Sequence, residues 1–213
     1  VVRRTAHLGA PARGSLLVLD DGSVVVGTLD RRVHRLDASL RPVFETVLAD
    51  GSASTLALTA RGALAVASGR LLSPHSPTAR ITRQLTLALR PIAAPSLADD
   101  GTLWVPTVEG VLHAIEPGGR IRSRTELGSR HYDGAAPAIG PDGAVRVPTM
   151  SEGVVCVGAG GTERWRFPSP AGFNAPISVD AAGTTLAVDR GGRLFAIDET
   201  GVERWRVVIG THT

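Results

Sequence analysis

The feature that most constrains the fold of this chain is an internal repeat of about 40 residues. A turn glycine recurs at this spacing, and its five copies are Gly22, Gly62, Gly101, Gly143 and Gly183. Two and four residues after each of the first four glycines stands a pair of apolar residues, such as Val24 and Val26. An apolar pair of this kind directly after a turn predicts a strand with a period of two.

A further strand and an aromatic position follow in the same repeat. Phe44, Trp165 and Trp205 share one position, each standing 22 residues after its turn glycine. Four antiparallel strands in about 40 residues are typical of a propeller blade, and a repeated aromatic residue in such a fold packs between blades. We therefore predict an all-β chain, a β-propeller with about five blades of four antiparallel strands each.

The repeat also sets the predicted boundaries. The blades cover residues 10–49, 50–91, 92–133, 134–173 and 174–213, and residues 1–9 have the phase of an extra outer strand. The chain is then a single propeller domain or part of a ring of seven or eight blades.

In the second blade, Pro74 and Pro77 fall where the third strand should run. Proline cannot donate to a β-ladder, so this strand is expected to be broken or to lie at an edge.

Composition removes several classes of function. All 23 basic residues are arginine, and they are scattered among 20 acidic residues, which leaves a net charge of +3. No basic block with interleaved aromatic residues is present, so nucleic-acid binding is not predicted. No apolar run approaches the roughly 18 residues of a membrane span. The single cysteine, Cys156, excludes an internal disulfide and a cysteine-based zinc site.

The last repeat carries the clearest sequence pattern. Residues 192–205 read Gly-Arg-Leu-Phe-Ala-Ile-Asp-Glu-Thr-Gly-Val-Glu-Arg-Trp, and weaker copies begin at Gly110 and Gly153. This pattern resembles the PQQ-like (quinoprotein-type) β-propeller repeat family. The chain is most similar to its non-enzymatic branch, which includes the propeller lipoprotein of the outer-membrane β-barrel assembly machinery. The resemblance implies a bacterial protein of the periplasm, the cell envelope or the extracellular space, although residues 1–9 contain no signal-peptide core.

No catalytic residue, cofactor or metal ligand is predicted. Quinoprotein dehydrogenases, which share the repeat, hold calcium with Glu, Asn and Asp, whereas Asn174 is the only asparagine of this chain. His34 and His113 share a repeat position at which another copy has phenylalanine, so both are expected to be packing residues. The acidic pairs 20–21 and 99–100 recur at a predicted hairpin turn, which favours turn formation over acid–base chemistry.

Loops that differ among the repeats are the best candidates for function, because the shared residues serve packing. On one propeller face, the loops before the first strands and between the second and third strands carry aromatic and charged residues. Such residues suit a protein or peptide partner. The candidate partner-binding residues are Arg31, Arg32, Glu109, His131, Tyr132, Asp133, Met150, Glu152, Phe173, Asn174, Asp189 and Arg190.

The function predicted from the sequence is thus a non-catalytic binding or scaffold protein. Two alternatives remain open. One is a ligand-sensing extracellular propeller module of a larger receptor or kinase. The other is a propeller enzyme, either a quinoprotein dehydrogenase or a metal-dependent lactonase or lyase. Self-association is expected if the ring is incomplete, because blade edges would then be exposed.

Overall fold

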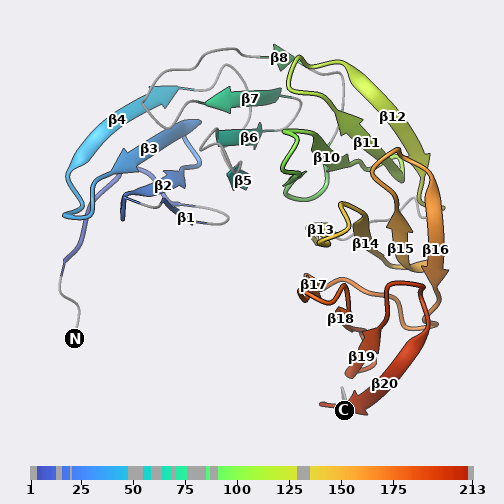
Figure 1. Cartoon of the computed structure of the whole chain (residues 1–213). Coiled ribbons are helices and arrows are strands. Elements are labelled where there is room, and N and C mark those ends of the chain that lie inside the picture. The colour runs from blue at the N-terminus through green and yellow to red at the C-terminus, as the bar shows by residue number, and fades with distance from the viewer. Residues whose placement is uncertain are drawn as a thin grey trace. The chain divides into compact units, whose positions relative to one another are not determined.

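The structure is a computed structural model that describes residues 4–12, 16–19, 21–47, 55–58, 64–68, 71–75, 85–86, 91–128 and 135–210. These residues form strands and turns, and no helix occurs among them. The described strands assemble into five antiparallel sheets of four strands, and in each sheet the strands lie in chain order (Figure 1). The predicted fold class, an all-β propeller of four-stranded antiparallel blades, is confirmed.

The sheets follow one another along the chain. The first sheet contains β1 (Leu17–Val18), β2 (Val24–Gly27), β3 (Arg32–Leu36) and β4 (Pro42–Val47), and the second contains β5 (Thr55–Leu58), β6 (Leu64–Ser68), β7 (Leu71–His75) and β8 (Leu85–Thr86). The third contains β9 (Ser96–Leu97), β10 (Leu103–Pro106), β11 (Val111–Ile115) and β12 (Ile121–Glu126). The fourth contains β13 (Ala138–Ile139), β14 (Val145–Thr149), β15 (Gly153–Val157) and β16 (Glu163–Phe167). The fifth contains β17 (Ser178–Val179), β18 (Thr185–Val188), β19 (Arg193–Ile197) and β20 (Glu203–Val208).

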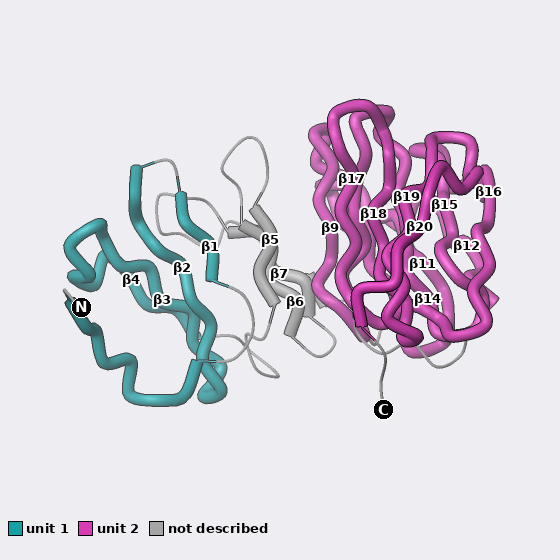
Figure 2. Tube along the Cα trace, turned by 90° about the horizontal axis from the view of Figure 1, so that it is seen from below, with its two compact units in different colours: residues 1–91 teal, residues 92–213 magenta. Residues whose placement is uncertain are grey.

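The chain divides into two compact units (Figure 2). Unit 1, Val1–Pro91, holds the first two sheets, and unit 2, Ile92–Thr213, holds the other three. Within unit 2 the first strands β9, β13 and β17 lie side by side. Each sheet falls inside one predicted blade, whereas a single domain over residues 1–213 stays a prediction. The extra outer strand over residues 1–9 also stays a prediction, since residues 4–9 form no strand in the described part of the chain.

The second sheet contains the strand that the prolines were expected to disrupt. β7 includes Pro74 and pairs with β6 along its length, with Pro74 opposite Ala65. On its other side β7 pairs with β8 at Leu71 and Leu72. The strand is therefore formed through Pro74, and an edge position stays a prediction, because residues 76–84, which include Pro77, lie outside the described residues.

The core of unit 2 lies between its sheets. Side chains alternate between the two faces of a strand, so the fourth sheet packs against the third with one face and against the fifth with the other. One buried cluster joins the third and fourth sheets, and its largest member is Trp104, which is 1% exposed. A second buried cluster joins the fourth and fifth sheets through Val154, Ala187 and Phe195, among others. Trp104, which has no counterpart in the other repeats, is therefore a core residue.

The shared aromatic position has different surroundings in the fourth and the fifth sheet. The Trp165 ring lies against Gly201, at which a Cβ would come within 2.8 Å of the ring, and its Nε1 donates to the Glu199 carbonyl at 2.8 Å. The prediction that Trp165 packs between blades is confirmed. The same prediction for Trp205 is wrong in this structure. Trp205, on β20, is 48% exposed.

Candidate functional site

The turns between the second and third strands of four sheets are closed in the same way. The hydroxyl groups of Thr28, Thr107 and Thr149 donate to the backbone carbonyl four residues later, at 3.2, 3.1 and 2.8 Å. At the corresponding position of the fifth sheet, Asp189 accepts a hydrogen bond from the Arg193 backbone N–H at 3.0 Å. Each turn thus presents a tip of three residues, and these tips are 29–31, 108–110, 150–152 and 190–192.

Five of the candidate residues predicted from the sequence lie in these tips. Arg31, Glu109 and Arg190 are exposed, and Met150 and Glu152 are half-buried. Arg31 has a φ of 68°, a left-handed conformation that is uncommon for residues other than glycine. Glu152 forms an ion pair with Arg166 at 3.3 Å. The exposed tip side chains are available to a partner.

Two other candidates hold their turns together. Arg32 forms ion pairs with Asp30, at 3.0 Å, and with Glu45. The buried carboxylate of Asp189 lies 2.6 Å from Arg193 Nη2 and accepts a hydrogen bond from Ser169 Oγ at 3.0 Å. Burial raises the pKa of Asp189, but hydrogen bonds from Arg193 and Ser169 outweigh that effect and leave this pKa below its usual value. Both residues therefore stabilise the turns.

Phe173 is a core residue, which corrects the expectation of an aromatic side chain available to a partner. It is 1% exposed, and its ring centroid lies 6.5 Å from that of Phe167 and 5.9 Å from that of Phe195. Sequence reasoning placed Phe173 in a loop, which is correct. The loop folds back onto the sheets, however, and buries its largest apolar side chain.

That loop, residues 168–177, contacts the two tips that carry the candidates Met150 and Arg190. The Phe173 N–H donates to the Thr149 carbonyl at 2.8 Å, and the Arg190 N–H donates to the Gly172 carbonyl at 3.0 Å. Gly172 has a φ of 69°, and a Cβ at this position would overlap the Met150 carbonyl. The loop therefore lies between the tips that carry Met150 and Arg190.

The loop does not collect every candidate. Glu109 belongs to the third sheet and makes none of these contacts. His131, Tyr132 and Asp133 lie outside the described residues.

Beside this loop is a cavity of about 960 Å³ in unit 2. Its apolar lining comes from Pro170, Ala171, Ala175, Val188 and Ile209. Asn174 and Arg190 also line it and are exposed, and neither side chain makes a hydrogen bond or ion pair with the described residues. An unpaired guanidinium and an unpaired amide beside apolar surface can bind a carboxylate and the backbone of a peptide.

The second aspartate of each acidic pair lies in its hairpin turn, as predicted, and Asp20 lies outside the described residues. Asp21 accepts a hydrogen bond from the Ser23 N–H at 2.9 Å, and Asp100 accepts one from the Thr102 N–H at 2.8 Å. Both carboxylates also pair with an arginine, Asp21 with Arg35 and Asp100 with Arg122. They form and fix the hairpin turns.

The histidines fit the packing position predicted for them. His34 and His113 are both buried, and burial is the main cause that lowers the pKa of each.

Among the residues that the structure describes, no group of three or more His, Cys, Asp or Glu side chains could hold a metal ion. In the same residues there is no helix of the length and apolar character that a membrane crossing requires.

Cys156 is expected to be inert in the folded protein. It is buried in β15, and burial raises the pKa of its thiol to about 11, so almost none of it is thiolate at neutral pH. We expect no reaction with the thiol reagent 5,5′-dithiobis(2-nitrobenzoate) in the native protein and one equivalent after unfolding in urea. Rapid reaction before unfolding would show that β15 opens readily.

Comparison with known proteins finds one family pattern in the C-terminal part of the chain. A protein-family pattern described as outer membrane protein assembly factor BamB matches residues 150–212, which include the fifth sheet and both Trp165 and Trp205. The crystal structure of BamB from Moraxella catarrhalis is similar over 98% of this chain and 80% of its own, with a TM-score of 0.58 and 14% identity. The match over residues 150–212 supports the resemblance of this part of the chain to the PQQ-like propeller repeats.

Other solved structures share the propeller fold of this chain. Virginiamycin B lyase from Staphylococcus aureus is similar over 94% of this chain and 70% of its own, with a TM-score of 0.76 and 17% identity. A chain of the mitotic checkpoint complex is similar over 92% of this chain and 64% of its own, with a TM-score of 0.77 and 11% identity. At these identities the likeness shows the fold alone. No curated protein matches the sequence.

Proposed function

We propose that this PQQ-like chain is a non-catalytic binding or scaffold protein whose unit 2 holds a protein partner at the cavity beside Asn174 and Arg190. The observation that carries the proposal is the composition of that cavity. It combines apolar walls with a guanidinium and an amide that no described residue engages. The partner is an extended segment with a carboxylate, from Asp, Glu or a chain end, because arginine binds carboxylates through two parallel hydrogen bonds.

The comparisons support an assembly role. The family pattern that matches residues 150–212 is named for an assembly factor of outer membrane proteins. One of the similar solved chains is part of a multiprotein complex. A place in a bacterial cell envelope belongs to the same proposal and is supported by the match to BamB.

Peptide display on the whole chain tests the proposal. Random peptides are selected on the wild-type protein, and their binding is measured again on Arg190→Glu and Asn174→Ala variants. We expect the selected peptides to be rich in acidic residues and to lose at least about tenfold in affinity on Arg190→Glu, about 1.4 kcal/mol of binding free energy. Asn174→Ala should cause a smaller loss.

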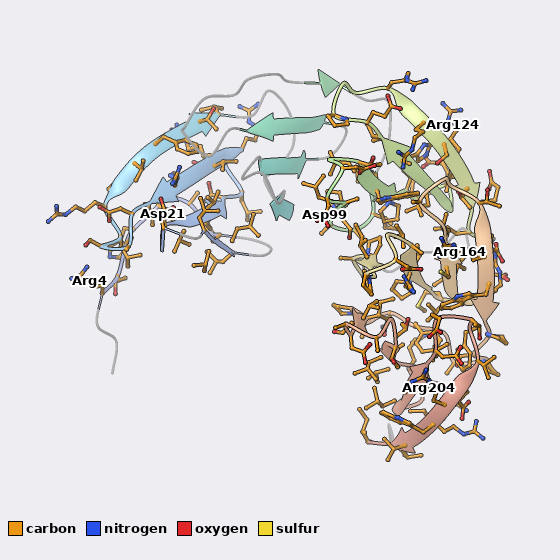
Figure 3. The ribbon with its side chains drawn as sticks, in the orientation of Figure 1. Arg4, Asp21, Asp99, Arg124, Arg164 and Arg204 are labelled. Carbon is orange, nitrogen blue, oxygen red and sulfur yellow. The ribbon has the colours of Figure 1, made fainter. Side chains whose placement is uncertain are left out.

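Arg124→Glu is the matched control. Arg124 is exposed on the outer strand β12, where Figure 3 labels it, and it forms no ion pair with the described residues. The same charge reversal at this position should leave affinity unchanged. If Arg124→Glu and Arg190→Glu weakened binding equally, the cavity would not be the site and the attraction would be one of overall charge.

A further inference from the structure

Unit 2 has a second cavity, at the opposite end of its sheets from the cavity beside Arg190. It measures about 650 Å³, and its lining includes the turns between the first and second strands of the third, fourth and fifth sheets. These turns are 98–101, 140–143 and 180–183. The tips described above connect second to third strands instead, so the length of a second strand separates the two ends. The two cavities share no residue.

The charged residues of this second cavity leave an excess of negative charge. They are Asp99, Asp100, Asp180 and Arg122. The only cation among them is already engaged, because Arg122 Nη1 lies 3.3 Å from Asp100 Oδ2 and Nη2 donates to the Ala159 carbonyl at 2.7 Å. The carboxylates of Asp99 and Asp180 form no ion pair with the described residues, so each can receive a cation from a partner.

The surroundings of these two carboxylates leave them open to a ligand. Asp99, which Figure 3 labels, is exposed, and its side chain makes no hydrogen bond within the described part of the chain. Asp180 is exposed as well, and its Oδ1 is fixed by the N–H groups of Ala182 and Thr184, at 2.9 and 2.8 Å. Arg204 lowers the pKa of Asp180 only from beyond ion-pair distance. A cation can therefore bind at either carboxylate without breaking an ion pair.

A buried donor faces the same cavity. Trp104 lines the cavity although it is only 1% exposed. Its Nε1 donates no hydrogen bond to the described residues, and it is not among the unpartnered polar atoms that are sealed from solvent. An indole N–H can only donate, so a ligand must offer it an acceptor such as a carbonyl oxygen. Apolar walls from Leu97, Ile139 and Val179 adjoin it.

We propose that the second cavity binds an extended basic segment of a protein partner, with lysine or arginine side chains at Asp99 and Asp180 and a backbone carbonyl at Trp104 Nε1. The unpartnered donor decides between the possible cations. A metal ion or a polyamine could pair with the carboxylates, but neither offers an acceptor to the indole N–H. A peptide supplies the carbonyl, and the apolar stems of its basic side chains can cover the apolar walls.

This inference goes beyond the proposed function and does not rest on it. The cavity beside Arg190 is suited to a carboxylate, whereas the second cavity is suited to a cation. One chain could therefore hold an acidic segment at one end of unit 2 and a basic segment at the other.

Peptide binding to the whole chain tests the inference. A library of acetylated and amidated peptides without aspartate or glutamate is selected on the wild-type protein. These peptides carry no carboxylate, so they lack the group proposed to bind at Arg190. We expect the selected peptides to be rich in lysine and arginine and to lose at least about tenfold in affinity on Asp99→Lys, because attraction becomes repulsion. Asp99 is the second residue of its turn, a place that accepts most residues, so the variant should fold.

Glu126→Lys is the matched control. Glu126 is exposed on the outer strand β12 and forms no ion pair with the described residues. The same charge reversal at this position should leave the affinity for the selected peptides unchanged. Equal weakening by Asp99→Lys and Glu126→Lys would reduce the attraction to one of overall charge and overturn the inference. A selected set without lysine or arginine would overturn it as well.

The indole N–H of Trp104 gives a second readout. The protein is labelled with ¹⁵N-tryptophan, and its three indole resonances are assigned with Trp104→Phe, Trp165→Phe and Trp205→Phe variants. A selected peptide should move the Trp104 proton resonance downfield, as a new hydrogen bond requires, and leave the other two in place. Spermidine, which has the charge but no acceptor, should not move it.

A peptide that binds without moving the Trp104 resonance contradicts the inference, and so does spermidine that moves it as far as the peptide. The acidic peptides and the Arg190→Glu variant test the other cavity. Failure of the proposed function is therefore distinguishable from failure of this inference.

Discussion

Replacing Asp142 by alanine is expected to lower the free energy of unfolding of unit 2 by about 3–5 kcal/mol. The Arg146 side chain is 0% exposed, and Asp142 is its acidic partner, with Oδ1 2.6 Å from Nη1. Arg146 Nε and Nη2 have no hydrogen-bond partner among the described residues. Without Asp142 the guanidinium would be a buried charge with only the Ala144 carbonyl as a partner. Urea unfolding followed by tryptophan fluorescence measures this loss, since Trp104, Trp165 and Trp205 all lie in unit 2.

The double variant Asp142→Ala/Arg146→Leu is the control. It removes the charge together with its partner, and an apolar side chain suits a position at which the third and fifth sheets have Trp104 and Leu186. Most of the lost free energy should return, because buried ion pairs can be replaced by apolar residues at little cost. A double variant as unstable as Asp142→Ala would show that Asp142 acts mainly through the turn that it caps.

Acid should reproduce part of this loss in the wild type. Burial raises the pKa of Asp142, but the hydrogen bonds from Arg146 and the Ala144 N–H, with the charges of Arg146 and Arg164, hold it below its usual value. Because the pKa of Asp142 is lower in the folded state than in the unfolded state, its carboxylate contributes fully to the free energy of unfolding at a pH above the unfolded-state pKa. This contribution is lost as the pH falls through the folded-state pKa. The double variant should lack this part of the acid dependence.

Phe173→Ala should destabilise unit 2 by about 3–5 kcal/mol, the usual cost of removing a buried phenylalanine ring. The ring is 1% exposed and packs in a buried cluster with Ile177, Ala187 and Phe195. Truncation would leave a cavity under the 168–177 loop. The measurement is again the midpoint and slope of urea unfolding by tryptophan fluorescence.

Asn174→Ala tests the next residue of the same loop. Its side chain is exposed and makes no hydrogen bond with described residues, so stability should stay within about 0.5 kcal/mol of the wild type. The two neighbouring substitutions thus separate the residue that holds the loop from the residue that can contact a partner. Equal destabilisation by both would mean that the loop is held by its backbone conformation rather than by the Phe173 ring.

The repeat predicted the sheets well because their determinants are local. A turn glycine, an aspartate before it and alternating apolar residues favour a hairpin, and three of the five copies have aspartate directly before the glycine. The repeat could not predict which of its aromatic side chains are exposed to solvent. Trp165 and Trp205 have the same sequence context, and only the presence of another turn beside Trp165 distinguishes them.

Two signals in the sequence were available and were missed. A threonine stands six residues after the turn glycine at Thr28, Thr107 and Thr149, and this regularity marks the residue that closes each turn. Arg146 stands where the other copies have valine, alanine, tryptophan or leucine, and a charge at an apolar position indicates a buried ion pair. The cavity beside Arg190 had no such signal, because it arises from how the 168–177 loop folds back.

The closed turns separate two tasks that many loops combine. Each closing side chain holds its hairpin through a hydrogen bond to the backbone four residues on, and in two of the turns it also bonds a tip residue, Asp30 or Glu152. The exposed side chains of Arg31, Glu109 and Arg190 take no part in these bonds, so their replacement need not disturb the strands beneath. This arrangement gives the chain several positions at which binding specificity can diverge between relatives, or foreign recognition sequences can be grafted, while the blades are inherited unchanged.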